Sequence, residues 1–174
     1  MTPSLIVVPD EERLARRAAE AIAQAAGESI AASGRFMLAL PGGQTPLPTY
    51  RLLASARIDW TRIYVFWGDE RCVPPDHPES NFGGASATLL DGTLIPRSQI
   101  YRMRGEDPDP DSAAADYAGT LGATFGINDG RPPRFDLILL GLGTDGHTAS
   151  LFPGSPALTE VSKNHSSSSP SCIS

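Results

Sequence analysis

Three short segments of the chain contain residue types that could do chemistry on a small anionic molecule, and each follows an apolar run. They are 41–45 (PGGQT), 68–71 (GDER) and 141–147 (GLGTDGH). Glycines let backbone amides approach a ligand, arginine can donate two parallel hydrogen bonds to a phosphate or carboxylate, and histidine exchanges protons near neutral pH. Together these types indicate acid–base chemistry on a phosphorylated substrate.

The first segment places Gly42 and Gly43 between an apolar run and the start of an expected helix. Free amides and the positive end of a helix dipole attract phosphate, and the Thr45 hydroxyl adds a donor. The alternative is an ordinary strand-to-helix turn in which Thr45 only caps the helix. The segment lacks the lysine of a P-loop, which argues against a nucleoside triphosphate.

The second segment places Asp69, Glu70 and Arg71 directly beyond an apolar run. Arg71 is the candidate cation for a phosphate or carboxylate, because its planar guanidinium can bind either group through two hydrogen bonds. Asp69 could orient a partner or accept from a sugar hydroxyl. For Glu70 we expect only a solvated loop charge.

The third segment presents His147 on a glycine-rich turn, with Asp145 close enough in sequence to influence its tautomer. A histidine of ordinary pKa, near ~6.5, can take a proton from water, and a well-placed general base accelerates a reaction by about 10²–10⁴. This chemistry suits hydrolysis of an activated ester. His77 and His165 lack comparable neighbours and are expected to be ordinary surface residues.

Gly141, Gly143 and Gly146 also match the G-x-G-x-x-G pattern of dinucleotide sites. That pattern requires a helix directly after the glycines, another strand, and an acidic residue about 20 positions later. Here residues 152–156 read FPGSP and a polar tail follows. The context therefore excludes the dinucleotide interpretation.

Apolar runs alternate with helix-length segments along the chain, which predicts an α/β fold. Continuous apolar strands indicate a mostly parallel sheet with helices on both faces, in a Rossmann-like single domain whose ligands gather at the carboxyl ends of the strands. Asp10 is the expected cap and Gly34 the expected end of the first helix. The expected strands are 5–8, 36–40, 63–67, 100–103 and 135–140, and the other expected helices are 46–55, 81–90 and 111–125.

The composition and the first residues of the chain limit the classes of partner, the location and the metal content that we expect. The chain has 174 residues, 40% of them hydrophobic, and a net charge of −6, which argues against nucleic acid or an anionic membrane as partner. Residues 1–10 lack the features of a signal peptide or a membrane span, so we expect a cytoplasmic protein. Two cysteines without a CxxC or His/Cys cluster predict no metal site. Residues 159–174 are Ser-rich and expected to be disordered or non-native.

Taken together, the three segments resemble the 6-phosphogluconolactonase family, part of a superfamily shared with glucosamine-6-phosphate isomerases. The resemblance covers nearly all of residues 4–158, with the motifs in the family's order and spacing. The matching segments are 40–46 (LPGGQTP), 68–71 (GDER) with 76–81 (DHPESN), and 140–154 (LGLGTDGHTASLFPG).

The resemblance implies a sugar-phosphate isomerase-like fold, a sugar-phosphate substrate, and neither metal nor organic cofactor. It implies that His147 activates water against the carbonyl of 6-phosphogluconolactone, with Arg71 and Asp145 assisting. The monomer or a weak homo-oligomer is the expected state. The resemblance also implies that the loop 42–45 and Arg71 hold substrate. With residues from the other two loops, the candidate substrate-binding residues are Gly42, Gly43, Gln44, Thr45, Asp69, Arg71, Gly143 and Gly146.

Members of this family continue well past the LFPG segment, whereas this chain turns into a serine-rich tail. The domain over 1–158 is therefore expected to be incomplete at its C-terminal end. Two alternatives follow: a catalytically silent sugar-phosphate-binding fragment, or a glucosamine-6-phosphate deaminase/isomerase. The latter family follows its histidine with an Asn-Glu-Pro element, where this chain has 150–153 (SLFP).

Overall fold

Four short segments pair in parallel in the order β4-β2-β1-β5. The computed structural model describes residues 3–127, 131–159 and 172–173. In the centre, β1 (Phe36–Leu40) pairs over its full length with β2 (Ile63–Trp67). The outer strands are β4 (Ile100–Tyr101) and β5 (Leu137–Ile138), which pair with β2 and β1 respectively. The expected parallel α/β sheet is confirmed.

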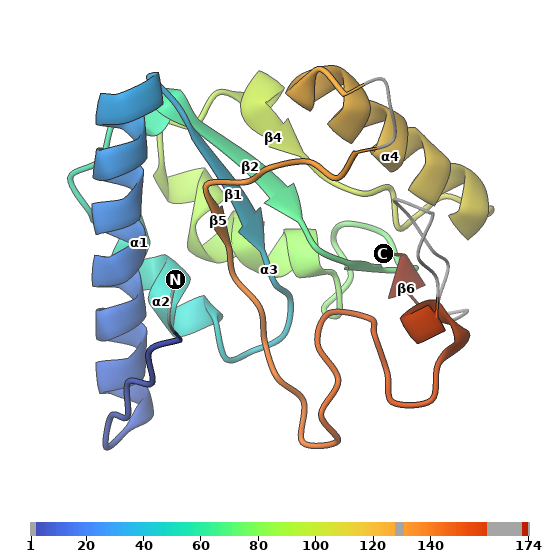
Figure 1. The fold of residues 1–174 in the computed structure, drawn as a ribbon, viewed down its shortest axis with the longest axis horizontal. Helices are drawn as coiled ribbons and strands as arrows, with labels where there is room; N and C mark the ends of the chain where they lie inside the picture. The colour runs from blue at the N-terminus through green and yellow to red at the C-terminus, as the bar shows by residue number, and fades with distance from the viewer. Residues whose placement is uncertain (1–2, 128–130, 160–171, 174) are drawn as a thin grey trace.

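Helices cover both faces of this sheet (Figure 1). Side chains of α1 (Glu11–Ser33), α2 (Leu47–Ala54) and α3 (Asn81–Thr88) pack against Phe36, Leu38 and Leu40 of β1. The alternate residues Met37 and Ala39 join a second cluster with α4 (Pro110–Phe125) on the opposite face. Short 3-10 turns are η1 (Trp60–Arg62), η2 (Leu90–Gly92), η3 (Arg97–Gln99) and η4 (Pro156–Thr159).

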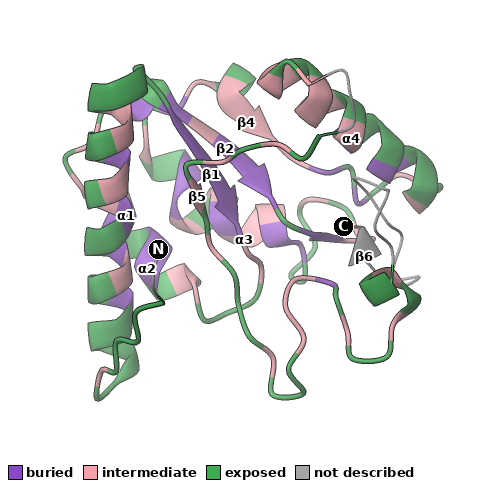
Figure 2. Cartoon of the chain, viewed as in Figure 1, coloured by how far each residue is buried: buried purple, intermediate pink, exposed green. Residues whose placement is uncertain are grey.

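The central strand β1 is buried on both faces, as Figure 2 shows. A strand covered on both sides must be apolar at every position, because no face is left for polar side chains. This explains the uninterrupted run FMLAL. Because β1 is parallel to β2 and β5, the loops that follow these three strands leave from the same carboxyl edge of the sheet.

The ends of α1 lie where the sequence predicts them. The Asp10 side chain accepts a hydrogen bond from the Arg13 amide at 2.8 Å, and Gly34 ends the helix with a φ of 77°. The start of α2 differs from the prediction, because Pro46, not Thr45, is the capping residue and no side chain caps this helix. The Thr45 hydroxyl is therefore not used at the helix start.

The prediction of a strand over residues 5–8 is wrong. This segment has no regular structure, and Leu5 and Val7 are 88% and 83% exposed. A strand is stabilised by its hydrogen-bonded partner, and within the described residues 5–8 pair with none. The edge strands β4 and β5 are also shorter than expected.

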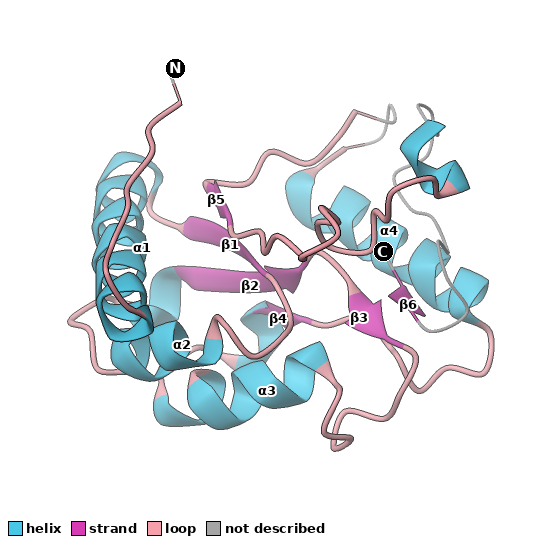
Figure 3. Cartoon of the chain, turned by 90° about the horizontal axis from the view of Figure 1, so that it is seen from below, coloured by secondary structure: helices cyan, strands magenta, loops and turns pink. Residues whose placement is uncertain are grey.

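One pairing was not predicted. The segment β3 (Glu70–Arg71) pairs antiparallel with β6 (Cys172–Ile173), beside the main sheet in Figure 3. Of the Ser-rich segment 159–174, the structure describes Thr159 and this two-residue strand, and the remainder of that prediction lies outside the described residues. Among the helices the structure describes, none combines the length and apolarity that crossing a bilayer requires.

Candidate active site

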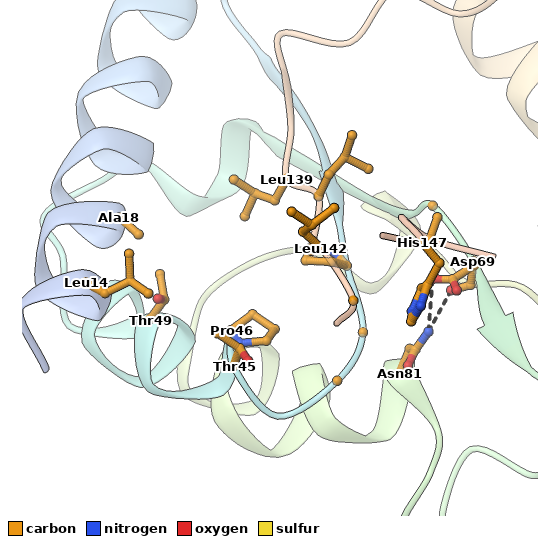
Figure 4. A pocket seen from close by; sticks show the side chains of 18 of the residues that line it. Leu14, Ala18, Thr45, Pro46, Thr49, Asp69, Asn81, Leu139, Leu142 and His147 are labelled. Carbon is orange, nitrogen blue, oxygen red and sulfur yellow. Dashed lines mark hydrogen bonds between the residues drawn. The ribbon is translucent and has the colours of Figure 1, made fainter. Parts of the chain in front are cut away.

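The three chemistry-bearing loops meet in one cleft at the carboxyl edge of the sheet (Figure 4). They follow β1, β2 and β5, and these strands are neighbours in the sheet, so their carboxyl ends lie side by side. The cleft has a volume of about 380 Å³. The candidate residues from the sequence that line it are Gly42, Gly43, Thr45, Asp69, Arg71, Gly143 and His147.

Three of the candidate site residues from the sequence lie outside this lining. Gln44 borders a neighbouring cavity of about 210 Å³, which shares Arg71 with the main cleft. Asp145 and Gly146 belong to the turn behind His147. The other wall of the cleft is apolar and comes from α1 and from the chain after β5, with Leu14, Ala18, Leu139 and Leu142 among its residues.

The glycine loop offers unused hydrogen-bond donors. Within the described residues, the backbone N–H groups of 42–45 donate to no acceptor, whereas the following Leu47 amide donates to the Gln44 carbonyl at 3.2 Å. Gly43 has a φ of 85°, a left-handed conformation that glycine adopts without strain. Unpaired amides before a helix form an anion-binding arrangement.

Arg71 lies between the two cavities and lines both. Its Nε is buried, and in the part of the chain that the structure describes it has no hydrogen-bond partner. A buried donor of this kind is costly to leave unpaired, so a ligand that accepts from it would bind favourably. Arg71 can therefore add a positive charge to the donors of the glycine loop.

Asp69 is nearly fully buried and both of its carboxylate oxygens accept hydrogen bonds. Oδ1 accepts from the Asn81 side chain at 3.2 Å, and Oδ2 accepts from the Ser150 hydroxyl at 2.8 Å. Asn81 also donates to the Asp69 backbone carbonyl at 3.0 Å, and Figure 4 shows these two side chains beside His147. Asp69 thus connects elements around the cleft.

The expectation that Glu70 is a solvated loop charge is wrong. Glu70 is only 2% exposed, and its carboxylate accepts hydrogen bonds from the backbone amides of Asn81 at 2.7 Å and Phe82 at 2.9 Å. Burial raises the pKa of Glu70, and hydrogen bonds from the amides of Phe82, Arg71 and Asn81 and from the Ser80 hydroxyl partly oppose that rise. Glu70 therefore caps the first turn of α3, which carries Asn81.

Replacing Glu70 with alanine is expected to lower the free energy of unfolding by about 2–3 kcal/mol, because two buried amides at the start of α3 lose their acceptor. Urea denaturation at neutral pH measures this loss. The control is Glu79→Ala, whose side chain is exposed and which should change stability by less than about 0.5 kcal/mol. Equal stability of the two variants would contradict the capping role.

His147 and Asp145 form the second half of the site. The Nδ1 atom of His147 lies 2.5 Å from Oδ1 of Asp145, and the His147 backbone amide donates to the same oxygen at 3.2 Å. Hydrogen bonds from that amide and then from the ring lower the pKa of Asp145, which remains an acceptor. Nδ1 therefore carries the proton, and Nε2 is left to accept another.

The close packing of this turn explains why it contains glycine. The Gly143 amide donates to the His147 carbonyl at 2.8 Å, and the Gly146 amide donates to the Gly143 carbonyl at 3.0 Å. A Cβ on Gly143 would lie 2.2 Å from Nδ1 of His147, so only glycine fits beneath the ring. The Phe152 ring packs over the imidazole with centroids 4.6 Å apart. Because both amides are used in the turn, neither is free to hold a substrate.

Sequence reasoning missed Asn81 and Ser150 as site residues. Both are buried, and both bond to Asp69 although they lie 12 and 81 positions from it in the chain. Both lie within the matched segments 76–81 and 140–154, but their residue types do not give their hydrogen-bond partners, which are set by tertiary contacts. Among the residues that the structure describes, no group of three or more His, Cys, Asp or Glu side chains comes together as a metal site.

Comparison with known proteins gives consistent matches. Residues 9–171 match the family model described as glucosamine-6-phosphate isomerases/6-phosphogluconolactonase. The chain is 45% identical to a 6-phosphogluconolactonase of Synechocystis sp. over 91% of its own length and 66% of that protein. It is 37% identical to a 6-phosphogluconolactonase of Mycobacterium tuberculosis, covering 94% and 68% respectively.

A solved structure agrees with these matches. The 6-phosphogluconolactonase from Trypanosoma cruzi superimposes with a TM-score of 0.85 at 29% identity, covering 99% of this chain and 74% of that one. The chain therefore spans about two thirds of the length of the curated relatives it matches.

Proposed function

Because the chain belongs to the glucosamine-6-phosphate isomerase/6-phosphogluconolactonase family, we propose that it hydrolyses 6-phospho-D-glucono-1,5-lactone to 6-phosphogluconate. This reaction would be its step in the pentose phosphate pathway, in the cytoplasm. The supporting observation is that one cleft holds backbone amides and an Arg71 Nε without partners among the described residues, together with an imidazole whose Nδ1 faces Asp145. Those groups match an anionic sugar whose ester carbonyl must be attacked by water.

In the proposed mechanism, His147 is the general base. Its Nε2 takes a proton from a water molecule while the water oxygen bonds to the lactone carbonyl carbon, and the carbonyl electrons move onto their oxygen. When the carbonyl re-forms, the bond to the ring oxygen breaks and that oxygen takes the proton from His147. Asp145 holds the ring orientation and stabilises the imidazolium that exists between the two transfers.

The substrate's negative charges need donors already in place. The amides of residues 42–45 and the Thr45 hydroxyl are proposed to hold the 6-phosphate, at the start of α2. The oxygen that becomes negative at the carbonyl would accept from Arg71, because the amides of the glycine loop are assigned to the phosphate. Gly143 is a poor candidate for this role, because its amide already donates to the His147 carbonyl.

The direct test is a pH-stat assay of acid release from freshly prepared 6-phosphogluconolactone, with an enzyme-free blank because lactones also hydrolyse unaided. Catalysed acid release above the blank supports the proposal. Ammonia release from glucosamine 6-phosphate would support the deaminase alternative instead. Binding of 6-phosphogluconate without turnover would indicate a silent sugar-phosphate binder.

A further inference from the structure

We infer that Ser150 is a positioning residue, whose hydrogen bond to Asp69 holds the His147 turn in its reactive orientation. The inference rests on the proposed lactonase function, since it concerns the group that acts as base there. Ser150 is 0% exposed and its hydroxyl donates to Oδ2 of Asp69 at 2.8 Å. It lies three residues after His147 in the chain.

Several hydrogen bonds close the turn that carries His147 on itself. The hydrogen bonds of the Gly143, Gly146 and Leu151 amides and of the Thr148 hydroxyl all join residues within 141–151. Such bonds fix the shape of the turn but not its place relative to the glycine loop. The turn follows β5, and the hydrogen bond from Ser150 to Asp69 connects it to the loop that follows β2. In the sheet, β1 lies between these two strands.

Asp69 is suited to this anchoring because its other contacts reach the remaining wall of the cleft. Its Oδ1 and its backbone carbonyl both accept from Asn81 of α3. Asn81 in turn lies against Gly42, where an added Cβ would be 1.8 Å from Oδ1 of Asn81. A chain of contacts therefore runs from the glycine loop through Asn81 and Asp69 to Ser150.

The backbone between His147 and Ser150 requires such an anchor. Ala149 has a φ of 48°, a left-handed conformation that a residue with a Cβ adopts only under strain. Strained backbone persists where surrounding contacts over-determine it. A hydroxyl bonded to a buried carboxylate is a strong contact of this kind, since charge-assisted hydrogen bonds are stronger than neutral ones.

Without the Ser150 hydroxyl, the turn is expected to relax at Ala149 and to carry the imidazole away from the substrate carbonyl. A displacement of about 1 Å at a reacting group can cost about 10²-fold in rate. We therefore expect Ser150→Ala to lower kcat by about 10–100-fold while KM changes by less than about threefold, because the phosphate-binding donors are untouched.

Two measurements separate positioning from a general loss of stability. The first is kcat and KM of Ser150→Ala, compared with Ser80→Ala at a temperature where both variants are folded. Ser80 is a matched control, because it is also a buried serine that donates to a buried carboxylate, Glu70, but it lies directly before α3, where its hydroxyl also accepts from the Gly83 amide. The second is the ¹H–¹⁵N NMR signal of the His147 ring, which reports its orientation and needs no turnover.

Support requires a kcat loss and altered ring signals in Ser150→Ala, with both readouts near those of the parent in Ser80→Ala. Ring signals unchanged by Ser150→Ala would overturn the inference, as would an equal kcat loss in the two serine variants. If the parent chain lacks lactonase activity, the proposed function fails, but altered ring signals in Ser150→Ala alone would still support the anchoring of the turn.

Discussion

Replacing His147 with alanine is expected to lower kcat for 6-phosphogluconolactone hydrolysis by about 10²–10⁴-fold, the range that a well-placed general base contributes. Among the described residues that line the cleft, the titratable side chains besides His147 are those of Asp69 and Arg71. Asp69 already accepts hydrogen bonds on both oxygens, and arginine stays protonated, so neither can take over as base.

Binding should survive this substitution. The amides of residues 42–45 and Arg71 are supplied by other loops, so the affinity for 6-phosphogluconate, measured by calorimetry, should change by less than about threefold. His77→Ala is the control, because His77 lies in an exposed loop outside the cleft lining, where its Nδ1 accepts from the nearby Glu79 amide. Turnover by His147→Ala equal to that of His77→Ala would refute the assignment of the base.

A methyl group on Gly42 is expected to disrupt both stability and catalysis. Its Cβ would lie 1.8 Å from Oδ1 and 2.1 Å from Cγ of Asn81, distances at which one group must move. Asn81 is buried and short, so moving it breaks its two hydrogen bonds to Asp69. We expect Gly42→Ala to lower the free energy of unfolding by about 1–3 kcal/mol.

The same substitution should lower kcat/KM by about tenfold or more, because the displaced Asn81 disturbs Asp69 and the glycine loop 42–45 together. Urea denaturation and steady-state kinetics measure the two effects. Gly27→Ala is the control: it lies in α1 with open space around the new methyl group, and should raise stability by about 0.5–1 kcal/mol.

A double variant tests whether the clash with Asn81 causes the loss of stability in Gly42→Ala. If the clash with Asn81 is responsible, then adding Gly42→Ala to a chain that already carries Asn81→Ala should cost little further stability, since the obstructing side chain is gone. Additive losses in the double variant would mean that the two residues act independently, and the contact between the glycine loop and α3 would then not explain the effect.

Local chemistry was sufficient to find several parts of this protein. The central strands β1 and β2 were predicted at their observed bounds, because strands buried on both faces appear as continuous apolar runs. Asp10 and Gly34 marked the ends of α1 through capping rules that involve only neighbouring residues. His147 stood out because glycines and Asp145 accompany it within the same turn.

Other expectations failed where the answer depends on residues far away in the chain. Residues 5–8 have the composition of a strand, but a strand needs a partner and this segment has none among the described residues. Glu70 is a charged residue in a polar segment, which is typical of a solvated loop. In the structure the start of α3 covers it and donates hydrogen bonds to its carboxylate. Neither outcome is encoded in the immediate neighbourhood of these residues.

The sequence by itself therefore determined the α/β class, the central strands and the chemical character of the three loops, because periodicity, capping and residue type act over a few positions. Only the tertiary structure decided that Asp69 accepts hydrogen bonds from Asn81 and Ser150, and that Glu70 caps α3. It also decided that Gly42, Gly43 and Thr45, whose amides have no acceptor within the described residues, line the same cleft as His147. The physical reason is that burial and hydrogen-bond partners come from packing segments far apart in the chain, and such contacts leave no local pattern.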